Sequence, residues 1–296
     1  MPSYPPSVKI VEVGPRDGLQ NEAAFLDTET KIAFINRLSE TGLSVIEVTG
    51  FVRPDRVPQL ADAEEVVRGI QKRPGVSYSV LVPNLKGLDR ALAAGACEIA
   101  VFTAASETFS QKNIHCSIAE SLERFRPVME KARDKGVRVR AYISCCLGCP
   151  YEGEIDSRKV AVLAKQLCDL GCAEISLGDT IGVGTPLQAR EMVTSVAGEV
   201  PIGCLAVHFH DTRGQALANI LACLELGVAT IDASVAGLGG CPYAPGASGN
   251  VATEDVVYML TGMGIETGVD LTKLIEVGRL ISERLGRANR SRVGQA

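Results

Sequence analysis

One complete strand–helix–strand unit lies in residues 206–235, which read AVHFHDTRGQALANILACLELGVATIDASV. The apolar run 206–210 and the run 230–235 each predict a buried strand. Between them, a stretch from about Arg213 to about Leu226 has the spacing of a helix, and Gly227 follows it as a stop signal. A strand joined through a helix to a second strand is typical of a parallel sheet.

The same order of elements recurs along most of the chain. Further stretches with helical spacing occupy 28–41, 117–135 and 156–170. A glycine stands between helix and strand at Gly42, Gly95, Gly136 and Gly171. The runs that predict strands are 8–13, 45–51, 78–82, 98–103, 137–144, 174–177, 206–210 and 230–235.

Eight strands that alternate with helices over about 250 residues predict an α/β fold of the (β/α)8 TIM-barrel type. A doubly wound open sheet is the alternative, but the turn 13–18 (VGPRDG) lacks the G-x-G-x-x-G spacing of its phosphate-binding turn. Helical patterns at 253–263 and 271–285 exceed the eightfold repeat, and we expect them to pack on the end of the barrel. We therefore expect one domain over 1–296, with the barrel at about 8–250 and C-terminal helices at about 251–286.

Composition narrows the class of protein. Hydrophobic residues make up 46% of the 296 residues, which is enough for a large core, and the net charge is −5. A nucleic-acid surface would need a basic stripe, so none is expected. No apolar run reaches the roughly 18–20 residues of a membrane span. Residues 1–7 show no export signal pattern, and we expect a cytoplasmic protein that binds no membrane.

The ten cysteines do not predict a disulfide framework, because no export signal accompanies them. The cluster Cys145-Cys146-Leu147-Gly148-Cys149 invites a zinc or redox interpretation. No second cysteine pair follows at zinc-finger spacing, which disfavours that interpretation.

His208 and His210 are two of only three histidines, and both lie in the strand 206–210. Side chains at i and i+2 of a strand share a face and lie about 6–7 Å apart. Two imidazoles at that spacing can bind one metal ion. The alternative is a pair of hydrogen-bonded core histidines.

The active site of a TIM barrel lies at the carboxyl ends of its strands, so polar residues should gather there. They do, at Glu12, Arg16, Asp17, Glu47, Tyr142, Asp179, His208 and His210. A carboxylate inside a strand is costly unless it is paired, so Glu12 and Glu47 need partners. Arg16 is the obvious cation near them.

If the barrel closes, the first strand adjoins the eighth and the eighth adjoins the seventh. Asp17 and Asn250 are then placed to complete a ligand set with the two histidines. Imidazole, carboxylate and amide ligands with open water positions suit Mg²⁺ or Mn²⁺, whereas zinc prefers a tetrahedral N/S set. Taken singly, Asp17 could instead be a helix N-cap and Asn250 a turn residue.

A glycine-rich loop, GLGGCPYAPGASGN, follows the last strand at 237–250. Such a loop can bend, bring the thiol of Cys241 over a substrate and exclude water. The alternative for Cys241 is a buried loop cysteine without chemistry.

Taken together, six segments resemble the 3-hydroxy-3-methylglutaryl-CoA (HMG-CoA) lyase family. They span nearly the whole chain in order, at 12–22, 102–109, 148–153, 177–182, 208–212 and 241–250. The resemblance implies a TIM barrel, a homodimer, and cleavage of the CoA ester into acetyl-CoA and acetoacetate.

The resemblance also implies roles for single residues. It implies a divalent cation held by Asp17, His208, His210 and Asn250. It implies Arg16 as the catalytic cation, Cys241 as a catalytic thiol, and an acyl-CoA pocket lined also by Glu12, Gln20, Glu47, Tyr142 and Asp179.

The chemistry suits these residue types. Cleavage requires a base, Asp17 or His208, to take the proton of a tertiary hydroxyl that a metal ion has acidified. Arg16 can neutralise the charge of the thioester enolate that forms. Cys241 could then protonate the enolate carbon.

The stretch 49–59 (TGFVRPDRVPQ) departs from the family pattern. Gly50 lacks the hydroxyl of the serine that family members usually carry, and Arg53 and Arg56 add two cations. A related ester such as citramalyl-CoA, which would release pyruvate, is therefore an alternative substrate. A synthase that condenses an acyl-CoA with a 2-oxo acid is a second possibility, and a non-catalytic binding protein is a third. His115 stands where the family usually has asparagine and receives no role.

Overall fold

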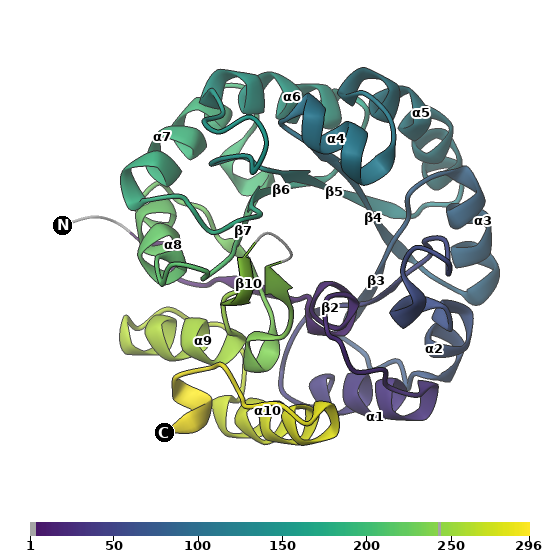
Figure 1. Cartoon of the computed structure of the whole chain (residues 1–296), viewed down its shortest axis with the longest axis vertical. Helices are drawn as coiled ribbons and strands as arrows, with labels where there is room; N and C mark the ends of the chain where they lie inside the picture. Colours follow the sequence, from purple (N-terminus) through teal and green to yellow (C-terminus); the bar gives the residue numbers. More distant parts are fainter. Residues whose placement is uncertain (1–3, 242–243) are drawn as a thin grey trace.

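The computed structural model describes residues 4–241 and 244–296, with the backbone alone at 241 and 244–248. Eight parallel strands form one closed barrel in sequence order, and the eighth pairs with the first. Figure 1 looks down this barrel. The strands are β1 (Lys9–Glu12), β2 (Val45–Gly50), β3 (Ser77–Leu81), β4 (Glu98–Ala104), β5 (Arg138–Ser144), β6 (Glu174–Asp179), β7 (Leu205–Phe209) and β8 (Thr230–Ala233).

The predicted TIM barrel is confirmed, and the open sheet is wrong. Each of the eight predicted strands is present, with ends shifted by at most two residues. The strands could be predicted from the sequence because helices cover their outer faces, so the residues on those faces are apolar. Turn residues also mark both ends of each apolar run.

Helices surround the barrel as an outer ring (Figure 1). The capping box that opens α5 is one reason why a helix begins there: the Ser117 hydroxyl accepts from the backbone N–H of Glu120, whose carboxylate accepts from the backbone N–H of Ser117. The helices are α1 (Thr28–Leu38), α2 (Ala63–Gly69), α3 (Leu85–Ala94), α4 (Glu107–Ile114), α5 (Ile118–Asp134), α6 (Ser157–Asp169), α7 (Pro186–Ala197), α8 (Ala216–Leu224), α9 (Thr253–Gly262) and α10 (Leu271–Leu285).

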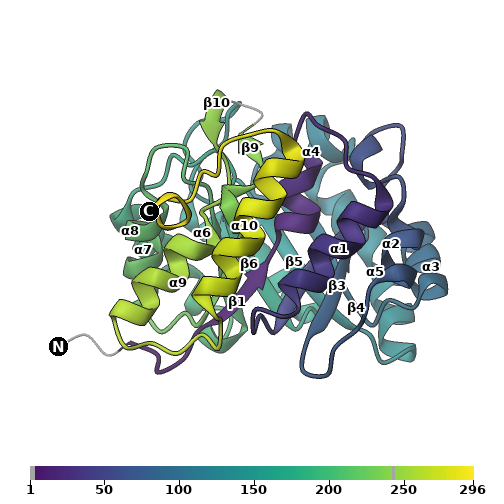
Figure 2. The same ribbon diagram turned by 90° about the horizontal axis from the view of Figure 1, so that it is seen from below.

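The expectation that the last two helices pack on the end of the barrel is wrong. Both α9 and α10 lie in the outer ring, with α10 beside α1 (Figures 1 and 2). The apolar side of α10, with Leu274, Val277 and Ile281, is buried. These helices cover the outside of the barrel where β8 meets β1, a surface that would otherwise be exposed to water.

The glycine-rich loop contains an element that its sequence did not predict. A short antiparallel pair, β9 (Gly240–Cys241) and β10 (Ala244–Ser248), lies above the barrel mouth (Figure 2).

None of the helices in the described part of the chain is long and apolar enough to cross a membrane. The nine cysteines whose side chains are described are free thiols, and Cys145, Cys146 and Cys149 are buried.

The barrel interior contains several charged side chains, whereas the outer face of the strands is mostly apolar. On β5, Val139, Ala141 and Ile143 belong to the apolar core between strands and helices. The alternating residues Arg140 and Tyr142 are also buried, and their side chains meet inside the barrel. This interior supports the site at the mouth.

A substitution at Gly42, in the loop after α1, tests the packing between α1 and α10. Its φ is +88°, and an added Cβ would lie 2.1 Å from the carbonyl oxygen of Gly268, in the loop before α10. Gly75 has a similar φ of +82° but open space around it. Gly75→Ala should lower the free energy of unfolding by about 1–2 kcal/mol through backbone strain alone. Gly42→Ala should lower it clearly further, and equal losses in urea unfolding would contradict this packing.

Candidate metal centre and active site

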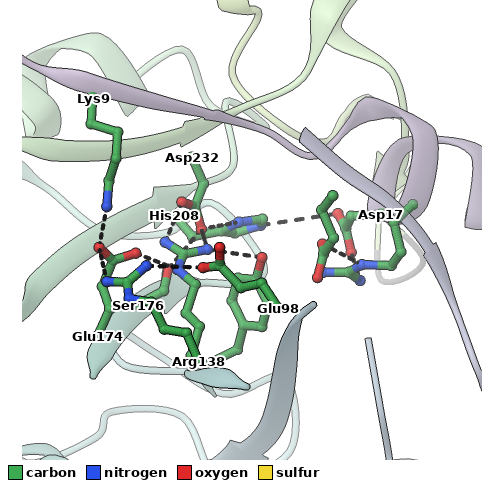
Figure 3. A network of polar contacts seen from close by, with 12 residues as sticks. Lys9, Asp17, Glu98, Arg138, Glu174, Ser176, His208 and Asp232 are labelled. Atoms are coloured by element: carbon green, nitrogen blue, oxygen red, sulfur yellow. Dashed lines mark hydrogen bonds and ion pairs between the residues drawn. The ribbon is translucent and has the colours of Figure 1, made fainter. Parts of the chain in front are cut away.

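Three side chains with metal-ligating atoms meet at the mouth of the barrel. One donor atom each from Asp17, His208 and His210 lies within 4.8 Å of the others. The Nε2 of His208 is 4.0 Å from the Oδ2 of Asp17, and Figure 3 shows this ring pointing toward Asp17. Around an octahedral cation with bonds near 2.1 Å, adjacent donors are about 3 Å apart and opposite donors about 4 Å apart. The closed barrel therefore brings the predicted carboxylate and imidazoles together.

A π-helical turn, Gly14–Gly18, begins directly after β1 and carries Arg16 and Asp17. A Cβ at Gly14 would lie 2.6 Å from an oxygen of Glu12, and one at Gly18 would lie 2.6 Å from the Cβ of Leu238. The turn therefore needs glycine at both positions. Asp17 lies inside this turn rather than before a helix, so the N-cap alternative for Asp17 is wrong. Turns of this kind occur frequently at functional sites.

Asn250 adjoins the cluster from the loop after β8. Its backbone pairs with that of His210 in an isolated bridge. Its side-chain nitrogen donates to the Oδ2 of Asp17 at 2.8 Å and to the carbonyl oxygen of Leu238 at 3.2 Å. The amide nitrogen, not the oxygen, thus faces Asp17, and ligation by Asn250 stays a prediction. Among the described residues, the buried Nδ1 of His210 has no hydrogen-bond partner, which fits a ligand atom.

The pKa shifts of Asp17 and His210 favour the protonation states that bind a cation. Burial alone would raise the pKa of Asp17, but Arg16 and the two histidines outweigh it and hold the pKa well below its usual range. Burial, reinforced by His208, lowers the pKa of His210 to about 4. At neutral pH the cluster therefore offers an ionised carboxylate and a neutral imidazole at His210, the protonation states that bind metals.

Arg16 is buried between two carboxylates. Its Nε donates to Glu47 at 2.6 Å, and its Nη1 donates to Asp17 at 2.7 Å. The guanidinium carbon lies 5.3 Å from the centre of the Tyr142 ring. Glu47 thus has the partner that its burial demands, while its Oε1 is buried without a partner among the described residues. The guanidinium is fixed in direction beside the metal-ligating cluster.

Glu12 and Asp179 have contacts that differ from those expected of substrate-binding residues. The carboxylate of Glu12 accepts from the backbone of Gly14 and Val235 and from the hydroxyl of Thr253. Asp179 accepts from the backbone N–H groups of residues 183 and 184. Both carboxylates are fully buried, and these contacts support a role in holding loops rather than direct contact with substrate.

Gln20, Tyr142 and Cys241 complete the predicted set. Gln20 is half-buried, and its Oε1 has no partner in the described part of the chain. The Tyr142 hydroxyl accepts from Arg140 at 2.9 Å, and its ring meets His208 edge-on at 6.0 Å. The side chain of Cys241 lies outside the described residues, so its role as a catalytic thiol stays a prediction.

Arg53, in the stretch after β2, is not a free cation at the site. Arg53 pairs with Asp55, and the two side chains are 72% and 61% exposed. A Cβ at Gly50 would lie 3.3 Å from Leu60 and from Leu81, so that position faces apolar side chains. The structure thus gives no contact through which Arg53 or Gly50 would alter the bound acyl group.

Sequence reasoning missed Arg140, Ser176 and Asp232. Asp232 accepts from Arg140 and Ser176 and lies 3.3 Å from the Nδ1 of His208. Burial would raise the pKa of Asp232, but Arg140 outweighs it and the pKa is lowered to about 2. The signal was available, since a lone carboxylate within a buried strand needs a partner.

Comparison with known proteins decides the family. The profile of the HMGL-like family matches residues 7–281. The mitochondrial hydroxymethylglutaryl-CoA lyase of Gallus gallus is 62% identical over 294 residues, which cover 99% of each chain. The chain belongs to the HMG-CoA lyase family. The predicted family is thereby confirmed, and with it the class of carbon–carbon lyases.

Solved structures of HMG-CoA lyases agree with this one throughout. The enzyme of Pseudomonas aeruginosa superposes with a TM-score of 0.97 at 57% identity, covering 99% of this chain and 97% of that chain. A lyase of Acinetobacter baumannii, solved with coenzyme A and 3-methylmalate, has a TM-score of 0.94 at 40% identity and covers 100% and 97%. The barrel is therefore the fold of this family.

The cluster predicts one Mn²⁺ site per chain. Calorimetric titration of the metal-free protein should show a single site, and His210→Ala should abolish measurable binding because it removes a ligand. His115→Asn is the matched control, because His115 is exposed and has a φ of +53°, which asparagine tolerates. Binding that survives His210→Ala, or that His115→Asn also abolishes, would contradict this site.

Proposed function

We propose that this protein cleaves HMG-CoA into acetyl-CoA and acetoacetate with the help of a divalent cation. The observation that carries the proposal is the convergence of Asp17, His208 and His210 beside the buried guanidinium of Arg16. The identity of 62% to a protein named hydroxymethylglutaryl-CoA lyase, over 99% of both chains, supports the substrate.

The cation would be held by Asp17, His208 and His210, with Asn250 as a fourth ligand through its amide oxygen. Oxygen and imidazole donors favour Mg²⁺ or Mn²⁺. When bound, such an ion acidifies a hydroxyl of the substrate that it contacts. Asp17 or His208 accepts the proton from that hydroxyl, and His208 can do so only while its Nε2 is not bound to the ion.

Arg16 stabilises the charge that the reaction creates. Once the hydroxyl is deprotonated, the carbon–carbon bond breaks, the oxygen becomes the ketone of acetoacetate, and the electron pair of the bond forms the enolate of acetyl-CoA. A guanidinium already held by Glu47 and Asp17 needs no reorganisation to meet this enolate oxygen. Cys241 supplies the proton that converts the enolate carbon to a methyl group.

Three competing functions are less well supported. Proteins that match over the full chain carry the name of HMG-CoA lyase, which disfavours citramalyl-CoA cleavage, a condensing synthase and a non-catalytic role. A homodimer remains our proposal from the family resemblance. We also propose a cytoplasmic location, although the relatives include proteins named mitochondrial and proteins named cytoplasmic.

Arg16→Gln should lower kcat about 10²–10³-fold, because a preorganised donor to the developing charge is lost. The variant also leaves Glu47 buried without a cation, so its thermal unfolding is measured in parallel. Arg16→Lys keeps the charge and separates the two effects. Arg158→Gln is the control, because Arg158 is 85% exposed and pairs with Asp156. An active Arg16→Gln enzyme would contradict the role of this guanidinium.

A panel of 3-hydroxyacyl-CoA esters tests the substrate. With Mg²⁺ or Mn²⁺ present, we expect acetyl-CoA and acetoacetate from HMG-CoA in a coupled spectrophotometric assay, and little pyruvate from citramalyl-CoA. Efficient cleavage of citramalyl-CoA without turnover of HMG-CoA would replace the proposed substrate. Release of free CoA from acetyl-CoA and a 2-oxo acid would instead favour a synthase.

A further inference from the structure

A buried polar network lies beneath the metal-ligating cluster, inside the barrel. Figure 3 shows it extending from Lys9 through Glu174 to Asp232, His208 and Asp17. Asp232 projects from β8 and is 1% exposed. Its Oδ2 lies 3.3 Å from the Nδ1 of His208, on the side of the ring away from Asp17. Asp232 is not one of the residues that the sequence motifs single out.

Asp232 can only accept hydrogen bonds in this environment. Arg140 donates to its Oδ1 at 2.5 Å and to its Oδ2 at 3.1 Å. The hydroxyl of Ser176 donates to the same Oδ2 at 2.7 Å. A carboxylate that receives a two-pronged guanidinium contact and a hydroxyl is in its ionised, acceptor-only form. The Nδ1 of His208 must therefore carry the hydrogen in this contact.

The tautomer of His208 follows from this requirement. A neutral imidazole with its hydrogen on Nδ1 has a lone pair on Nε2. The Nε2 of His208 is the atom that faces Asp17 at 4.0 Å. The lone pair thus points toward the space between the predicted ligands.

The surroundings also restrict how Asp232 and the ring can turn. The Nε of Arg140 donates to Glu174 at 2.7 Å, and its Nη1 donates to the hydroxyl of Tyr142 at 2.9 Å. The Tyr142 ring meets His208 at an interplanar angle of 81°. Arg140 is therefore held from two sides while it holds Asp232.

We propose that Asp232 is a positioning residue that fixes His208 as the Nδ1–H tautomer and so presents its Nε2 to the cation. The inference rests on the proposed metal site. Partners that orient a ligating histidine typically change metal affinity by 10–100-fold when they are removed.

The tautomer can be measured without any metal or variant of the network. Long-range ¹H–¹⁵N NMR of the metal-free wild-type protein at pH 8 should show His208 protonated on Nδ1. The chain has only three histidines, and His115→Asn and His210→Gln assign their signals. A hydrogen on Nε2 of His208 would overturn the inference.

Metal affinity provides the second measurement. Asp232→Asn should weaken Mn²⁺ binding 10–100-fold and give a mixture of His208 tautomers, because an amide can donate as well as accept. Ser176→Ala removes a bond to the same Oδ2 but keeps its charge, and it should leave both readouts unchanged. Unchanged affinity in Asp232→Asn, or equal losses in both variants, would overturn the positioning role.

The two measurements separate this inference from the proposed function. A wild-type protein that binds no Mn²⁺ would overturn the metal site, while the NMR measurement would still decide the tautomer. If Asp232→Asn does not fold, the wild-type spectrum decides alone.

Discussion

Closure of the barrel between β1 and β8 is the constraint on which the site depends. The register pairs Glu12 with Ala233 and Val11 with Asp232. It sets the turn after β1 beside the loop after β8, and β7 adjoins β8 on the other side. Asp17, His208 and Asn250 come from three separate segments, and only this closure brings their side chains into contact. The helices α9 and α10 cover the outside of the same junction (Figure 2).

The pairing of charges inside the barrel follows from the cost of burying an unpaired charge. An isolated buried ion is strongly unfavourable, so each of the two buried guanidinium groups is paired with two carboxylates. Arg16 lies between Glu47 and Asp17, and Arg140 lies between Glu174 and Asp232. Pairing of this kind fixes direction as well as charge. The orientation of His208 is one consequence, because its imidazole contacts a carboxylate that Arg140 and Ser176 already hold.

Buried acids at the mouth have two different functions that look alike in a sequence. Asp17 belongs to the candidate cation site, whereas Glu12 and Glu254 accept from backbone N–H groups of the segment 234–238. In that segment Ala236 has a φ of +56°, a conformation that costs energy for a residue with a side chain. Its N–H and carbonyl are both bonded, to Glu254 and to Arg287. These contacts hold the base of the glycine-rich loop, while the metal-ligating groups remain available to a ligand.

The sequence by itself determined the eight strands, the class of fold and the residues that meet at the mouth. Apolar periodicity and glycine stops are local signals, and side-chain alternation places His208 and His210 on one face. Only the tertiary structure decided where α9 and α10 pack, that Asn250 turns its nitrogen toward Asp17, and that Asp232 contacts His208. The reason is physical: periodicity states which face of an element is apolar but not what covers it. The partner of a buried charge depends on register and side-chain direction across strands that are distant along the chain.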